Sequence, residues 1–166
     1  PNIGLSTTCD GPFSRSPLCR TSETPEVLLW GDSFAMHLVQ GLRASAKDFP
    51  IQQHTMSRCS PVLGLARVGN SHTNDWARSC MEFNDQVLDW LRQNDSIEYV
   101  ILSSPMNIID GMLLLRDGTV RDLGDNMDTI ERETIRTVEM IRETGAKVVF
   151  ISPTPRPKRD IGLCTA

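Results

Sequence analysis

A serine between an apolar segment and a helix-like segment is the residue of this chain best suited to chemistry. Ser33 follows the apolar run 26–30 and the pair Gly31–Asp32, and it precedes a helix-like pattern over 34–42. Glycine permits a tight turn between two such segments. The free N–H groups and the positive dipole end of a new helix can stabilise an oxyanion. The spacing predicts a nucleophilic serine; the alternative is a helix cap, since Ser and Asp are also the usual capping residues.

Length and composition restrict the class of protein. The chain has 166 residues, which suits one domain with a real core, and its net charge of −4 argues against a nucleic-acid surface. No apolar run reaches the length of a membrane span. The start at 1–4 has neither the basic nor the apolar region of a signal peptide, so we expect a piece of a longer protein.

Five cysteines indicate the redox compartment. Cys9 and Cys19 bracket one loop-like stretch, and Cys59 and Cys80 bracket another. No Cys-x-x-Cys pair supports a zinc site. We predict the disulfides Cys9–Cys19 and Cys59–Cys80 and an oxidising compartment. Cys164 is left as a free thiol or pairs outside this sequence; the alternative is five reduced thiols in a cytosolic protein.

The periodicity predicts an α/β domain behind these residues. An irregular arm covers 1–25, a loop covers 57–77, and a short hairpin is expected around 112–119. Expected strands are 26–30, 51–56, 99–102 and 147–151, and expected helices are 34–47, 80–94 and 126–144. Apolar strands that alternate with helices predict a parallel sheet covered on both faces. Ser33, 103–107 and 152–156 follow strand ends, so they should converge on one crevice.

Four stretches together resemble a known family. The segment 30–35 (WGDSFA) resembles the first signature block of SGNH, or GDSL, hydrolases. The segments 57–64, 80–84 and 151–164 are similar to the SGNH domain fused to family-3 membrane acyltransferases of bacteria. The resemblance implies a three-layer sandwich with a central parallel sheet, flavodoxin-like in arrangement. It implies a single SGNH domain over 1–166, with 1–25 as an N-terminal extension.

The resemblance also assigns roles around the serine. It implies that Ser33 carries the acyl group as an ester and that the Ser33 backbone N–H is one oxyanion donor. Gly64 and Asn107 are the candidates for the other two donors. The family's Gly-x-Asn block lacks its glycine here, because 103–107 reads Ser-Ser-Pro-Met-Asn. The alternative for Asn107 is an asparagine that begins a loop.

The general base is the main departure from the family. The family's Asp-x-x-His block does not occur in this sequence, so we expect the C-terminal part of the fold to be missing from it. His37 is an alternative base, because it lies one helical turn after Ser33, toward which its side chain leans. No orienting partner for it is evident, and the alternative is an ordinary helix residue. We expect His54 to be structural and His72 to be exposed.

The resemblance implies a periplasmic or otherwise extracytoplasmic domain, tethered to the inner membrane in the full-length protein. A membrane acyltransferase domain would donate an acyl group, most simply acetyl, which Ser33 would pass to a cell-surface glycan. The alternatives are a carbohydrate acetylesterase, a non-catalytic glycan-binding or docking module, and an α/β domain with no acyl chemistry. We expect no cofactor, no metal and no nucleic-acid partner, and the oligomeric state stays open. Arg156, Lys158 and Arg159 could contact an anionic glycan, and the alternative is a solvated loop. Trp76 and Trp90 could stack on sugar rings, and the alternative for Trp90 is packing of its helix.

Overall fold

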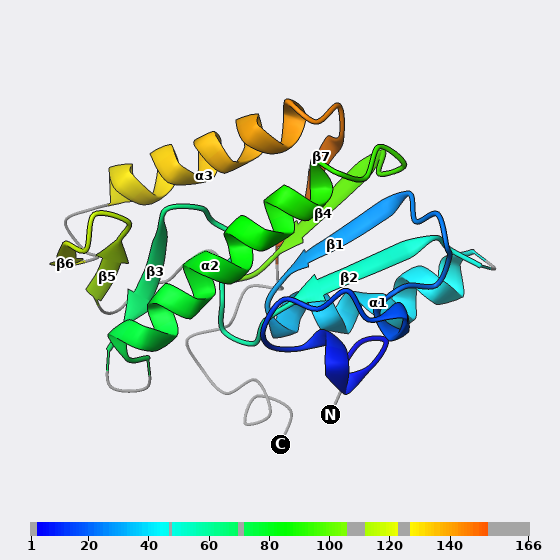
Figure 1. Cartoon of the computed structure of the whole chain (residues 1–166), viewed down its shortest axis with the longest axis horizontal. Coiled ribbons are helices and arrows are strands. Elements are labelled where there is room, and N and C mark those ends of the chain that lie inside the picture. Colours follow the sequence, from blue (N-terminus) through cyan, green and yellow to red (C-terminus); the bar gives the residue numbers. More distant parts are fainter. Residues whose placement is uncertain (1–2, 47, 70–71, 106–111, 123–126, 153–166) are drawn as a thin grey trace, which may run out of the picture.

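Four parallel strands form the central sheet of the computed structural model (Figure 1). The structure describes residues 3–46, 48–69, 72–105, 112–122 and 127–152. The strands lie in the order β2-β1-β4-β7, and their bounds are β1 Val27–Gly31, β2 Ile51–Thr55, β4 Tyr99–Ser103 and β7 Lys147–Phe150. All three pairings within this sheet are parallel. The four strands expected at 26–30, 51–56, 99–102 and 147–151 are therefore confirmed, and every end lies within one residue of the expected one.

Helices cover both faces of this sheet. Helix α1 (Ser33–Ser45) packs on one face, where Val27 and Leu29 of β1 meet Val39 of α1. Helices α2 (Asn74–Leu91) and α3 (Met127–Arg142) lie on the other face, where Trp30 of β1 is fully buried (Figure 1). Alternate residues of one strand thus face different helices, as the two-residue period of a strand requires. This is the expected three-layer α/β sandwich.

A small antiparallel sheet stands beyond the carboxyl ends of the parallel strands (Figure 1). It consists of β3 (Leu65–Val68), β5 (Met112–Leu115) and β6 (Val120–Asp122) in the order β3-β5-β6. The hairpin of β5 and β6 is the one expected around 112–119. An apolar cluster that includes Leu65, Leu113 and Ile130 packs this sheet against α3.

The expectation of a loop over 57–77 was wrong in two places. Strand β3 lies within it and is stabilised by backbone hydrogen bonds to β5. Four residues of sequence are too few to predict such a strand, because strand formation depends on the neighbouring strand. Helix α2 begins at Asn74 and not near residue 80. Thr73 caps this helix through its side-chain oxygen, which accepts a hydrogen bond from the Trp76 N–H at 3.2 Å.

Two disulfides confirm the cysteine pairing expected from the sequence. Cys9 is bonded to Cys19, and Cys59 is bonded to Cys80. The first closes the N-terminal arm over two short 3₁₀ turns, Thr7–Cys9 and Pro17–Cys19. This arm is bound to the end of β2, where the Thr55 hydroxyl donates to the Cys9 carbonyl at 2.7 Å. Cys164 lies outside the described residues.

Candidate active site

Ser33 is the first residue of α1, directly after the end of β1, and it is half-buried. The helix cap is Asp32, whose Oδ1 accepts a hydrogen bond from the Phe34 N–H at 2.8 Å. The capping alternative for Ser33 is therefore excluded. Within the described part of the chain the Ser33 hydroxyl has no hydrogen-bond partner, so it is available for another atom.

Gly31 is required by the close approach of two strands. A Cβ atom at this position would collide with the backbone carbonyl oxygen of Ser103 at the end of β4. The Asp32 N–H also points at that carbonyl, at 3.4 Å. The glycine thus lets β1 and β4 come together just before the serine, which fixes where α1 begins.

Asp32 is the buried carboxyl group of the site, only 4% exposed. Burial raises its pKa above the ordinary value, although the hydrogen bonds from the Phe34 N–H and the Ser104 hydroxyl act in the opposite direction. Its two oxygens are both used, because Oδ1 accepts from Phe34 and Oδ2 accepts from Ser104 at 2.9 Å. Asp32 is therefore a cap and an anchor for its neighbours.

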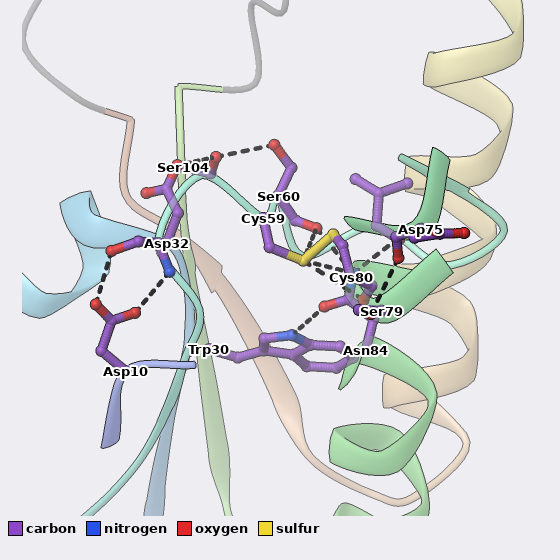
Figure 2. The surroundings of a disulfide bond; sticks show 12 residues. Asp10, Trp30, Asp32, Cys59, Ser60, Asp75, Ser79, Cys80, Asn84 and Ser104 are labelled. Carbon is purple, nitrogen blue, oxygen red and sulfur yellow. Dashed lines mark hydrogen bonds between the residues drawn. A yellow bond between two sulfur atoms is a disulfide. The ribbon is translucent and has the colours of Figure 1, made fainter. Parts of the chain in front are cut away.

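A chain of hydroxyl groups connects Asp32 to the loop after β2 (Figure 2). Ser104, which follows β4 and is 2% exposed, has its Oγ 3.1 Å from the Oγ of Ser60. Ser60 belongs to the loop next to the Cys59–Cys80 disulfide. Three segments far apart in the sequence, at Asp32, Ser60 and Ser104, thus meet beside Ser33.

The loop that carries Ser60 is held from two sides (Figure 2). Asn84 of α2 is fully buried; its amide donates to the Ser60 carbonyl at 2.9 Å, and its oxygen accepts from the Trp30 indole N–H at 2.8 Å. On the other side Asp10 of the N-terminal arm accepts hydrogen bonds from the N–H and the hydroxyl of Ser57 at 2.7 and 2.8 Å. These contacts fix the loop with respect to β1.

The structure places Gly64 at the far end of the same loop, against α3. Its carbonyl accepts a hydrogen bond from the Arg116 N–H at 2.8 Å, and a Cβ atom there would lie 2.9 Å from the Glu133 carboxylate. Its φ of +85° favours glycine in any case. The residue of this loop that contacts the Asp32 network is Ser60, through its hydroxyl group. The oxyanion role of Gly64 stays a prediction, and Asn107 lies outside the described residues.

The three histidines have different surroundings. His37 is exposed on α1, and among the described residues it has no hydrogen bond to Ser33 or to an orienting carboxylate. His54 on β2 is buried as expected, between Phe13 at 4.7 Å and Trp90 at 4.9 Å between ring centroids. Burial and, to a lesser extent, the Arg15 charge lower the pKa of His54 to about 3.

Two expectations about the loop before α2 were wrong. His72 is buried, at 7% exposed, and its ring packs edge-on against Trp76 at 4.5 Å. Trp76 is not a loop residue, because it lies in the first turn of α2 and packs partly buried against the core. Trp90 is buried in the core, as the packing alternative requires. Arg156, Lys158 and Arg159 lie outside the described residues.

The sequence reasoning missed the network of Asp32, Ser104 and Ser60 and the clamp of Asp10 on Ser57. A partial signal was present, because serines directly follow β4 and lie in the loop after β2. Strand ends of a parallel sheet meet at one edge, so polar residues at two such ends are candidates for contact. The identity of the partners needed the register of the sheet.

Fold and site together define a three-layer α/β domain with a candidate nucleophile, Ser33, at its first strand-to-helix turn. The family model described as "SGNH domain (fused to AT3 domains)" matches residues 8–166, and the chain belongs to this family. No curated protein and no solved structure gives a match. No helix among the described residues is long and apolar enough to cross a bilayer.

Proposed function

We propose that this domain transfers an acyl group, most simply acetyl, through an ester of Ser33 to a hydroxyl group of a bacterial cell-surface glycan. The observation that carries the proposal is the position of Ser33 in a family fused to membrane acyltransferase domains. Its hydroxyl is not used as a cap, and the N-terminus of α1 lies beside it. The two disulfides support an extracytoplasmic site of action.

The proposed reaction has two balanced steps. In the first, Ser33 Oγ attacks the carbonyl carbon of the acyl donor, its proton passes to a base, and the bond to the leaving group breaks as that group takes a proton. In the second, a sugar hydroxyl attacks the Ser33 ester, loses its proton to the base, and Ser33 regains a proton. The Ser33 N–H would stabilise the oxyanion in both steps. The base of the scheme would be the histidine of the family's Asp-x-x-His block, which does not occur in this sequence, and His37 of α1 is the alternative.

The test is Ser33→Ala in the full-length protein, produced in cells that lack the natural gene. We expect glycan O-acetylation, measured by mass spectrometry of the released glycan, to fall to background. Ser45→Ala is the matched control, because Ser45 ends the same helix and its hydroxyl donates to the Leu42 carbonyl of that helix. Acetylation retained in Ser33→Ala would contradict the proposal.

The isolated chain distinguishes the remaining functions. Exposure to p-nitrophenyl acetate followed by intact-mass measurement reports an acetyl group on Ser33. An acetyl group that Ser33→Ala abolishes supports covalent catalysis, and its release by water without a sugar acceptor would indicate an acetylesterase. An isolated chain without a Ser33-dependent acetyl group is an incomplete or a non-catalytic unit. A non-catalytic glycan-binding or docking module also predicts that Ser33→Ala leaves glycan acetylation in cells unchanged. The observation that favours this second candidate is the exposed position of His37, which has no hydrogen bond to Ser33 within the described part of the chain.

A further inference from the structure

A concavity rich in arginine lies between the small sheet and α3. Its volume is about 280 Å³, and its lining includes both charged and polar side chains. The arginines of the lining, which we call the arginine pocket, are Arg116, Arg121, Arg132 and Arg136. The acidic residues of the lining are Asp117 and Glu133. Positive charge therefore predominates at this place, although the whole chain has a net charge of −4.

The guanidinium groups of this pocket have donors to spare. Glu133 is the shared partner of Arg132 and Arg136, at N···O distances of 3.7 and 3.8 Å, which are too long for good hydrogen bonds. The guanidinium groups of Arg121 and Arg136 donate no hydrogen bond within the described residues. Arg116 is different, because it forms a bidentate pair with Asp85 at 2.6 and 2.9 Å.

Such a set of donors selects the chemistry of the ligand. A guanidinium group presents a planar fork of N–H donors that matches a carboxylate, and each has five donors to satisfy. The carboxylates of Asp117 and Glu133 can in turn accept hydrogen bonds from hydroxyl groups. A ligand that combines one acidic group with several hydroxyl groups therefore fits the lining better than a simple anion does.

The pocket is connected to the serine site through one loop. Ser60 belongs to the Asp32 network, and Gly64 lines the pocket. Four residues of chain span at most about 14 Å, so the two regions lie within the reach of one oligosaccharide. Figure 1 shows the small sheet on the side of the parallel sheet where the strands end, which is also where α1 begins.

We propose that the arginine pocket binds the carboxylate of an acidic sugar in the acceptor glycan, so that a neighbouring hydroxyl is presented toward Ser33. This rests on the proposed function for the identity of the acceptor. It does not depend on it for the binding itself, which is measured without any acyl transfer.

The experiment measures binding of the 166-residue chain to trigalacturonate, with the neutral galactose trisaccharide as the comparison ligand. We expect trigalacturonate to bind and the neutral trisaccharide to bind at least tenfold more weakly. The double variant Arg121→Gln, Arg136→Gln should lose at least tenfold in affinity for trigalacturonate. Arg136→Lys, which keeps the charge without the fork, should lose part of that affinity.

The matched control is the double variant Arg78→Gln, Arg92→Gln. It removes the same charge from α2 and the residue that follows it, since Arg78 is paired with Asp75 and the C-cap residue Arg92 is paired with Asp89. We expect it to keep affinity within twofold. Equal losses in the two double variants would overturn the proposal, because only the net charge of the chain would then matter. Equal binding of the two trisaccharides would also overturn it, because the carboxylate would then contribute nothing to the affinity.

Two further measurements test whether the pocket binds a phosphate or an anionic membrane surface in place of a sugar carboxylate. Inorganic phosphate should displace trigalacturonate only at much higher concentration, and displacement at lower concentration would overturn the proposal in favour of a phosphate ligand. Vesicles that contain phosphatidylglycerol should not sediment with the chain; sedimentation that the arginine variant abolishes would overturn it in favour of a membrane surface. Ser33→Ala should keep full affinity for trigalacturonate, so a failure of acyl transfer and a failure of binding are told apart.

Discussion

At the residue scale, Asp32 determines how Ser33 is presented. It caps α1 through the Phe34 N–H and holds Ser104 through its second oxygen. Both oxygens of this carboxyl group are engaged and neither meets a histidine in a hydrogen bond, so Asp32 is not arranged as the acid of a catalytic triad. Its burial, which raises its pKa, is a cost that the cap and the hydroxyl chain offset.

His54 should give the stability of the domain a marked dependence on pH. It is neutral in the fold, because burial lowers its pKa to about 3, whereas an unfolded histidine titrates near 6.5. The unfolded chain therefore binds the extra proton first. Above about pH 6.5 His54 is neutral in both states and does not lower the free energy of unfolding. As pH falls from 6.5 toward 3 the proton binds to the unfolded chain, so the free energy of unfolding decreases. Urea unfolding at pH 7.5 and 4.5 should show a loss on the order of 2 kcal/mol from this residue.

The variant His54→Phe isolates this effect. Its ring can take the same place between Phe13 and Trp90, and the Nε2 atom of His54 has no hydrogen-bond partner among the described residues. We expect a flatter stability curve between pH 7.5 and 4.5 than for the unchanged protein. His37→Gln is the control, because His37 is exposed and its replacement should leave the slope unchanged. A slope that survives in His54→Phe would show that other groups are responsible.

At the element scale, α2 organises the site by holding the loop after β2. Asn84 joins three elements, because it bonds to Trp30 of β1 and to the carbonyls of Ser60 and Val62 in that loop. Asn84→Ala would leave a buried indole N–H and two carbonyls without this partner. We expect a loss of about 2 to 4 kcal/mol in the free energy of unfolding, together with weaker Ser33 acetylation.

Asn94→Ala is the matched control for that prediction. Asn94 lies just after α2, and its amide donates to the Trp90 carbonyl at 2.6 Å in a partly buried position. Its loss should cost about 1 kcal/mol and leave Ser33 reactivity unchanged. Urea unfolding followed by tryptophan fluorescence measures the first quantity, and intact mass after p-nitrophenyl acetate measures the second. Similar losses in both variants would mean that Asn84 has no special role in the loop.

Some strands and helices of this fold could be predicted from the sequence, and others could not. Strands β1 and β4 were predictable, because a strand buried on both faces is commonly apolar throughout, as in Val27–Trp30. Strand β2 is also buried along its whole length, although four of its five residues are polar. Strand β3 was not predictable, because four residues with Arg67 in the middle carry no clear period. The start of α2 was hidden by polar residues on its outer face, although Thr73 was a capping signal.

The candidate site also has a part that could be predicted from the sequence and a part that could not. The position of Ser33 after the first strand was predictable from the residues around Gly31, since local sequence decides where a strand ends and a helix begins. The contact of Ser60 with Ser104 was not, because it depends on how two loops fold over the sheet edge. The position of a residue at a strand or helix end can therefore be predicted from its neighbours in the sequence, whereas contacts between distant loops are known only from the packed structure.

At the scale of the whole molecule, β7 forms the outer strand of the central sheet among the described residues. Two of its apolar side chains are exposed, Val149 at 38% and Phe150 at 49%. They belong to opposite faces, because adjacent residues of a strand point in opposite directions. Within the part of the chain that the structure describes, β7 is paired along one edge, with β4. An apolar edge strand with free backbone groups is a template for pairing with another chain.

We therefore expect this 166-residue chain to associate with itself as its concentration rises. Val149→Lys should reduce this association, because a charge at an edge strand opposes further pairing, and it should leave the thermal midpoint nearly unchanged since the side chain is already exposed. Sedimentation velocity between 5 and 500 µM would measure both proteins. Ile135→Lys is the control, because Ile135 is 50% exposed and belongs to α3 and not to the edge strand. If Ile135→Lys lowers association as much as Val149→Lys does, general surface hydrophobicity and not the edge of β7 drives the contact; if only Val149→Lys lowers it, the open edge is where the central sheet accepts another strand.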